Sequence, residues 1–245
     1  MLNVFITGTD VNVGKTFITA GLAATMQSLG YQTCVYKPVD TDAIQKNGFA
    51  QSPDLVFVKN VDPYIKIASS YLLKHSASPS IAAEMEGKII DKNVIKKDYY
   101  TIGKDIDCII TECTGGIMTP LAPNFFVSDM VKELNLPVVI IVKPSLGVIN
   151  QTLLTINHLQ EKRIKVRGVI INNYPEKTDD IDLKNLPRLI EEYSDVKILG
   201  IIKNIQENQK IEKGQKIDPS NLITEILNGI DVESVFDIKI AKLDV

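Results

Sequence analysis

One short segment restricts the fold of this chain more than any other. Residues 8–16 read Gly-Thr-Asp-Val-Asn-Val-Gly-Lys-Thr and match the pattern GxxxxGK[ST]. An apolar run at residues 2–7 precedes the segment, and helical periodicity at residues 15–29 follows it. A strand, a glycine-rich loop and a helix in this order form a P-loop, in which backbone N–H groups and the helix N-terminus surround phosphate oxygens. We therefore expect a P-loop NTPase-like fold.

The rest of the chain alternates strand-like and helix-like segments. Its apolar runs are nearly continuous, which is typical of strands covered on both faces. The repeated order of strand and helix predicts an α/β fold, a doubly wound and mostly parallel sheet with helices on both faces. Gly30 and Pro137 are expected to end a helix and to precede a strand, respectively. The predicted strands are 2–7, 33–36, 108–111, 138–142, 166–171 and 198–202, and the predicted helices are 15–29, 126–134, 149–163 and 182–193.

The composition excludes several classes of protein. With 245 residues, 44% of them apolar and 23% charged, the chain is neither disordered nor a disulfide scaffold. The 27 basic and 30 acidic side chains include no long basic run, and no apolar run could span a bilayer, so we expect no nucleic-acid and no membrane partner. Cys34, Cys108 and Cys113 lack CxxC spacing and are expected to be reduced core residues of a cytoplasmic protein.

We expect residues 1–245 to form a single domain. Residues 42–64 are the least periodic and predict an active-site loop or a surface decoration. After Gly229 the tail alternates weakly, which would suit either an edge strand or packing on a partner. His75 and His158 are isolated from each other and from the cysteines, so we interpret both as structural or surface residues.

The P-loop predicts five residues that bind nucleotide. Asn12, Val13 and Gly14 would bring backbone N–H groups to the phosphates of ATP. Lys15 would face the β and γ phosphates, and the Thr16 hydroxyl would bind Mg²⁺. A P-loop names a superfamily and no reaction, so the reaction depends on what else lines the loop.

Polar residues follow three other predicted strands. Pro38 forces Lys37 into extended backbone at the ligand-binding edge of the sheet, where Lys37 would meet a substrate anion or be a solvated surface lysine. Glu112 is either a metal-directed acid or a solvated strand end. Asn172 could pair with a purine edge or could be a turn asparagine.

Further short motifs stand out along the chain: Gly8-Thr9-Asp10, Tyr36-Lys37-Pro38-Val39, Ser78-Pro79, Glu112 with Gly115-Gly116, Thr119-Pro120-Leu121, and Leu146-Gly147-Val148-Ile149-Asn150. Together these motifs resemble the dethiobiotin synthetase family. Their order and spacing agree over residues 1–205, which leaves 206–245 as an extension of uncertain role. The resemblance implies a homodimeric, ATP- and Mg²⁺-dependent ligase that closes a ureido ring on the diamine 7,8-diaminononanoate with CO₂, the penultimate step of biotin synthesis.

The same resemblance implies roles for individual residues around the nucleotide. Thr16, Asp54 and Glu112 would be the Mg²⁺ ligands, although Asp54 has little support apart from the resemblance. Lys15 and Lys37 would be the catalytic lysines around the γ phosphate and a substrate carbamate. Asn172 would contact the adenine.

Three residues would bind the substrate. Thr41 stands at the hydroxyl position of the family pattern Lys-Pro-Val-x-Ser-Gly and would meet a substrate amine or carbamate. Gly147 and Asn150 belong to a segment that, in the family, offers backbone N–H groups to the substrate carboxylate across the dimer interface.

The chain departs from the family pattern at four places. Val11 and Asn12 replace a threonine and, often, an acidic residue in the P-loop. The usual Glu-Gly-Ala-Gly-Gly reads Glu-Cys-Thr-Gly-Gly at residues 112–116. Asp42 stands in place of a glycine, and Gln151 in place of a common histidine.

Two other functions are alternatives for a chain with this P-loop. Switch ATPases of the chromosome-partitioning or septum-positioning kind carry a lysine five residues before the P-loop lysine, where this chain has Asp10. Amide synthetases of corrin biosynthesis usually add a glutamine amidotransferase domain, for which this chain is too short.

Overall fold

A parallel β-sheet runs through the centre of the protein. The computed structural model describes residues 1–46, 48–175, 177–203 and 218–240. Its strands are β1 (Leu2–Gly8), β2 (Thr33–Asp40), β3 (Ile44–Lys46), β4 (Phe49–Gln51), β5 (Lys66–Leu72), β6 (Cys108–Glu112), β7 (Pro120–Ala122), β8 (Phe125–Phe126), β9 (Val138–Val142), β10 (Val166–Tyr174) and β11 (Ile198–Lys203). Within the described ranges the central sheet has seven strands in the order β11-β10-β9-β1-β6-β2-β5, and β3–β4 and β7–β8 form separate antiparallel hairpins.

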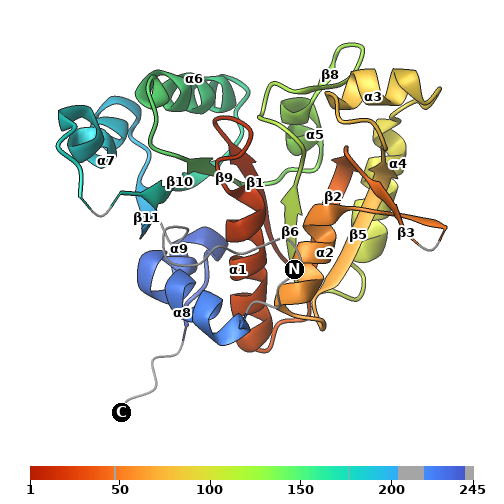
Figure 1. Ribbon diagram of the computed structural model, residues 1–245, viewed down its shortest axis with the longest axis horizontal. Coiled ribbons are helices and arrows are strands. Elements are labelled where there is room, and N and C mark those ends of the chain that lie inside the picture. The colour runs from red at the N-terminus through yellow and green to blue at the C-terminus, as the bar shows by residue number, and fades with distance from the viewer. Residues whose placement is uncertain (47, 176, 204–217, 241–245) are drawn as a thin grey trace.

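Helices cover both faces of this sheet, as the sequence predicts (Figure 1). They are α1 (Lys15–Ser28), α2 (Pro53–Val61), α3 (Pro79–Met85), α4 (Lys92–Ile102), α5 (Val127–Glu133), α6 (Val148–Glu161), α7 (Ile181–Ser194), α8 (Pro219–Gly229) and α9 (Val232–Phe236).

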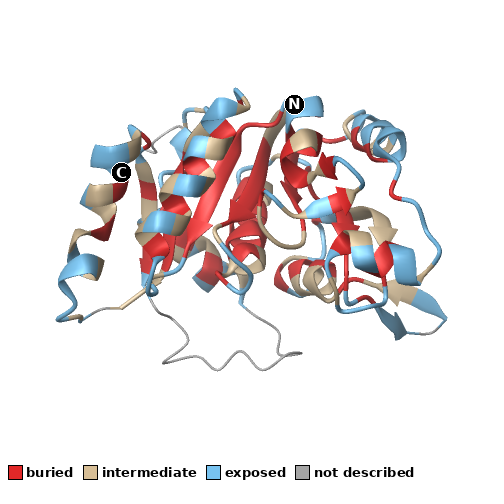
Figure 2. Ribbon diagram, turned by 90° about the horizontal axis from the view of Figure 1, so that it is seen from above, coloured by how far each residue is buried: buried red, intermediate tan, exposed pale blue. Residues whose placement is uncertain are grey.

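The alternation of side chains along β1 shows how the two faces are filled. Val4 and Ile6 belong to the core cluster that contains residues of α1, α2, α8 and α9. Phe5, between them, belongs to the cluster that contains residues of α3 to α7. Successive side chains of a strand point to opposite faces, so an apolar run buries both. Figure 2 shows buried residues concentrated in the strands between the two helical layers.

The predicted ends of the first helix are confirmed. Gly30 has φ +92°, and its N–H donates to the Gln27 carbonyl, while the Tyr31 N–H donates to the Met26 carbonyl. This pair of bonds is the Schellman motif, which a glycine in the left-handed region permits. Pro137 directly precedes β9, also as predicted.

The sequence prediction missed several elements on one side of the sheet. It had no strand at β5 and no helix at α3 or α4. For residues 42–64 it predicted an active-site loop or a surface decoration and no regular elements, whereas the structure has the β3–β4 hairpin and α2 there. Ser52 caps α2 by accepting a hydrogen bond from the Leu55 N–H, and Pro53 suits the first helical turn.

The tail after Gly229 packs on this chain's own sheet. The edge strand predicted as one alternative does not form over residues 230–240, and packing on a partner, the other alternative, stays a prediction. A single antiparallel bridge joins Ile230 to Gly200, and α9 then buries Val235 and Phe236 in the core. Residues 241–245 of the tail lie outside the described residues.

The three cysteines agree with the sequence prediction. All three are buried and free of disulfides, in or next to β2 and β6. In the described part of the chain, no helix is both long and apolar enough to cross a membrane.

Candidate active site

Three strands end side by side at the candidate site. β6 pairs with β1 on one side and with β2 on the other, all parallel. Their carboxyl ends therefore bring Gly8, Asp40 and Glu112 to one edge of the sheet. This is the edge where doubly wound sheets bind ligands.

The P-loop fills the space between β1 and α1. Gly14 is the N-cap of α1 and has φ +90°, a region that side chains disfavour. Lys15 is 8% exposed, and its ammonium donates to the Asp10 carbonyl (3.1 Å). Asn12 also has a positive φ, and the side chain of Val11 points largely into solvent. The loop thus has the left-handed positions that a phosphate cradle requires.

Asn172 supports the P-loop from the end of β10. Its buried amide nitrogen donates to the Val13 carbonyl (2.9 Å). A Cβ added to Gly14 would lie 2.0 Å from that nitrogen, so the loop and Asn172 are packed directly against each other. The predicted adenine contact of Asn172 stays a prediction, and its contact with the loop is one that the sequence did not indicate.

Lys37 is an enclosed charge at the centre of the site. Its side chain is 2% exposed, and its ammonium contacts the carboxylates of Asp40 (2.9 Å), Asp54 and Glu112 (3.7 Å). Burial opposes the charge, but attraction to the three carboxylates outweighs burial and raises the pKa of Lys37 above its usual value. Lys37 is therefore a buried ammonium and not a surface lysine.

The pKa values of Glu112 and Lys15 are shifted by burial, which fits an enclosed site for an anion and a metal. Burial raises the pKa of Glu112, opposed by the charge of Lys37. Burial also lowers the pKa of Lys15, against the attraction of Glu112. Both groups are desolvated, so a bound phosphate or cation would interact with them strongly.

The oxygen atoms near the P-loop suit Mg²⁺. The Thr16 hydroxyl donates to a Glu112 carboxylate oxygen (3.2 Å), which places two of the predicted ligands together. Among the described residues, no group of three or more His, Cys, Asp or Glu side chains is arranged to hold a metal ion. A nucleotide-bound Mg²⁺ needs only one or two carboxylates, because phosphates and water supply its other ligands.

Asp40 is one of the carboxylates around Lys37, although the sequence did not indicate it as a site residue. It is 3% exposed and pairs with Lys37 three residues before it in β2. Its position between Lys37 and Thr41 in the sequence was the available signal, but in a strand residues i and i+3 point to opposite faces, so the contact was not expected. Thr41, predicted to bind substrate, is buried beside it.

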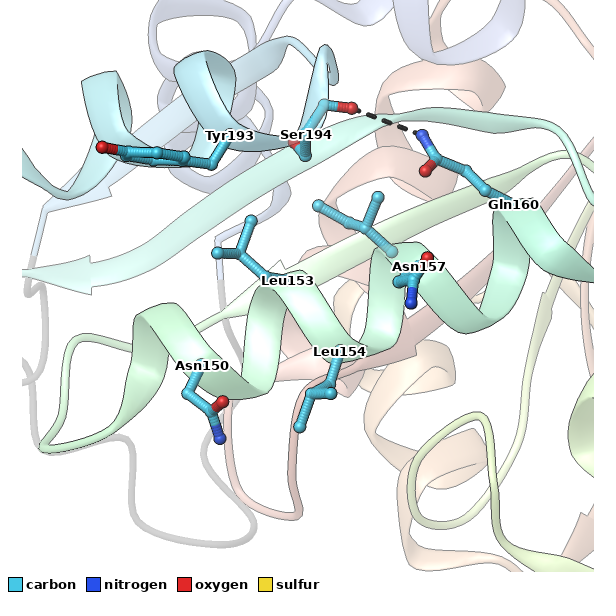
Figure 3. Close-up of a pocket in the computed structure, with 8 residues that line it drawn as sticks. Asn150, Leu153, Leu154, Asn157, Gln160, Tyr193 and Ser194 are labelled. Atoms are coloured by element: carbon cyan, nitrogen blue, oxygen red, sulfur yellow. Dashed lines mark hydrogen bonds between the residues drawn. The ribbon is translucent and has the colours of Figure 1, made fainter.

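The remaining predicted residues lie on another element. Gly147 is the N-cap of α6, and Asn150 lies in its first turn. Asn150 lines a pocket of about 300 Å³ between α6 and α7, together with Leu153, Leu154 and Tyr193 (Figure 3). None of the residues that line this pocket is Lys37 or one of the carboxylates around it. His158, on the same helix, contacts the Ser128 hydroxyl, as a structural residue would.

Curated relatives identify the family. The chain is 34% identical over 208 residues to the ATP-dependent dethiobiotin synthetase BioD of Methanocaldococcus jannaschii, covering 83% of this chain and 95% of the relative. It is 34% identical over 229 residues to the BioD of Brachyspira hyodysenteriae, covering 90% and 97%. The chain belongs to the dethiobiotin synthetase family. It is thus an enzyme of a family of ATP-using ligases.

Two further comparisons agree with a P-loop fold. The family model described as an AAA domain matches residues 3–211. Among solved structures, the MinC:MinD cell division complex of Aquifex aeolicus has TM-score 0.60 with 15% identity, covering 99% and 98% of the chains. The cell division ATPase MinD of Pyrococcus furiosus has TM-score 0.57 with 16% identity, covering 93% and 99%. At such identity the likeness shows the fold alone, so it does not favour the switch ATPase.

Proposed function

We propose that the protein is an ATP- and Mg²⁺-dependent ligase that forms the ureido ring of dethiobiotin from 7,8-diaminononanoate and CO₂. The observation that carries the proposal is the buried ammonium of Lys37 among carboxylates at the P-loop edge. The relatives' shared name supports it. Lys37 and Lys15 supply positive charge in an enclosed site, and Mg²⁺ would offset the charge of Asp54 and Glu112, so the site suits an anionic substrate that receives a phosphoryl group.

The reaction needs no protein nucleophile. One substrate amine attacks CO₂, forms a C–N bond and loses a proton, which gives a carbamate. A carbamate oxygen then attacks the γ phosphorus while the bond to ADP breaks. The second amine attacks the carbonyl carbon of this mixed anhydride, phosphate leaves, a proton is released and the ring closes. Phosphoryl transfer of this kind depends on positioning and charge neutralisation.

This chain's residues divide the work as follows. Lys15 and the backbone of Asn12, Val13 and Gly14 bind the phosphates of ATP. Lys37 neutralises the carbamate and the transferring phosphoryl group. Mg²⁺, when bound, would draw charge from the phosphate oxygens. Its protein ligands would be Thr16, Asp54 and Glu112.

The substrate contacts are also proposals. Thr41 binds a substrate amine or carbamate, and Asn172 contacts the adenine in addition to the P-loop. Residues 1–245 act as one domain, and the protein works in the cytoplasm.

We expect the active unit to be a homodimer. The family resemblance implies that Gly147 and Asn150, at the start of α6, bind the substrate held by the other subunit. Light scattering combined with an activity assay checks this. A monomer with full activity would contradict the dimer.

The central experiment measures phosphate release. We expect purified protein to release phosphate from ATP only when diamine and bicarbonate are both present, because the proposed acceptor of the phosphoryl group is the carbamate that these two form. Assays that omit each component in turn are the controls. Equal phosphate release with and without the diamine would refute the ligase.

A further inference from the structure

Asp40 is the most firmly held carboxylate beside Lys37. Its Oδ1 accepts hydrogen bonds from the Thr114 hydroxyl (3.0 Å) and from the backbone N–H of Thr41 (3.1 Å), in addition to the Lys37 ammonium. Its Oδ2 accepts from the Ser52 hydroxyl. Four donors are about as many as a carboxylate can accept, so Asp40 has little capacity left for another ligand.

The other two carboxylates differ from Asp40 in this respect. The side chain of Asp54 is 42% exposed, and Lys37 is the partner that holds it. Glu112 lies farther from the ammonium and accepts a hydrogen bond from Thr16 of the P-loop. Both are proposed ligands of Mg²⁺, so each would exchange Lys37 for the metal when Mg²⁺ binds.

The donors that fix Asp40 come from separate parts of the fold. Ser52 is the N-cap of α2 and accepts from the Leu55 N–H while it donates to Asp40. Thr114 follows β6, where the family pattern given above has an alanine. Asp40 thus joins the end of β2 to the start of α2 and to the segment after β6, and Thr114 is this chain's own contribution.

We propose that Asp40 is a positioning residue, the fixed counter-ion that holds the Lys37 ammonium in place when Asp54 and Glu112 turn to the metal. The contact of Lys37 with the phosphoryl group rests on the proposed function, but the ion pair between Lys37 and Asp40 does not. Asp40 touches no substrate and acts through Lys37. Asp40 thereby keeps the ammonium at a fixed position beside the transferring phosphoryl group, where a fixed positive charge stabilises the transition state.

A double-mutant cycle tests the proposal. We expect Asp40→Asn to lower kcat by about 10- to 100-fold and to leave KM for ATP within about threefold of the wild type. The substitution removes the charge-assisted contact with Lys37, which is proposed to act in the transition state and not in the binding of ATP. In a Lys37→Gln background the same change should lower kcat by less than about threefold, because residues that act through each other are not additive. Asp98→Asn, which also loses a serine contact, is the matched control and should leave kcat unchanged. Equal losses in both backgrounds would overturn the proposal.

Thermal unfolding of the metal-free proteins gives a readout besides activity. Asp40→Asn should lower Tm by about 6 °C or more when Lys37 is present, because it breaks a buried pair, and by clearly less in Lys37→Gln. The same shift in both backgrounds would overturn the pairing. This readout stands even if wild-type protein shows no diamine-dependent turnover, a result that would refute the proposed function alone.

Thr114→Val serves if Asp40→Asn does not fold. It keeps the charge of Asp40 and removes one of its anchors. We expect a drop in kcat of about 3- to 10-fold that disappears in the Lys37→Gln background. A kcat equal to that of the wild type would show that Asp40 does not need this anchor and would overturn the proposal.

Discussion

Lys37→Ala is expected to lower kcat by at least about 100-fold, a loss of about 3 kcal/mol of transition-state stabilisation, and to change the affinity for ATP by no more than about threefold. The ammonium is 2% exposed, so water cannot take over its role. Nucleotide binding depends mainly on the P-loop, which the substitution does not touch. Steady-state kinetics with diamine and bicarbonate, together with calorimetric titration of ATP, measure the two quantities.

The variant needs a check on folding. Removing Lys37 leaves Asp40 and Glu112 buried without their cation, which in other proteins costs about 3–5 kcal/mol of stability. Circular dichroism should establish that the assayed protein is folded, and Lys37→Gln offers a less disruptive alternative. Lys92→Ala is the matched control, because Lys92 pairs with Glu133 on the surface and should leave turnover unchanged. Undiminished kcat in a folded Lys37 variant would refute the role of the ammonium.

The fold was predictable where strands are apolar throughout. Residues 138–142 match β9 residue for residue, because each side chain is apolar and buried on one face or the other. β5 was missed because it is an edge strand, half-exposed along most of its length, and contains Ser69 and Ser70. α4 was missed for a similar reason, since only Ile95 and Tyr99 of this polar helix are buried. Burial on one side leaves a weaker pattern than burial on two.

The site residues that could be predicted from the sequence are those that lie at the ends of strands. Lys37 and Glu112 follow parallel strands, so the edge of the sheet brings them together. Asp54 lies on α2, outside any strand, and only the resemblance indicated it. Two of the four contacts of Asp40 join it to distant parts of the chain, Ser52 at the start of α2 and Thr114 after β6, and no local pattern encodes where those segments lie.

Gly14→Ala is expected to weaken ATP binding by about 100-fold or more, since hydrogen bonds to a charged phosphate contribute about 1.5–3 kcal/mol each and more than one would be displaced. Gly14 has φ +90°, a conformation that strains any residue with a Cβ. The new methyl group would also lie 2.0 Å from the Asn172 amide nitrogen. Asn172 would have to leave the Val13 carbonyl, so the loop would lose its support at the same time. Calorimetric titration of ATP measures the effect.

Gly30→Ala is the control for backbone strain outside the P-loop. Gly30 ends α1 at the far side from the P-loop, has φ +92°, and a Cβ there would meet nothing within 4 Å. Gly30→Ala therefore carries the same backbone strain, about 1–2 kcal/mol, without the contact with Asn172. We expect it to lower Tm and to leave ATP affinity within about twofold of wild type, because its strain is far from the phosphates. If Gly14→Ala bound ATP as tightly as Gly30→Ala does, the packing of Asn172 against the P-loop would not matter for nucleotide binding.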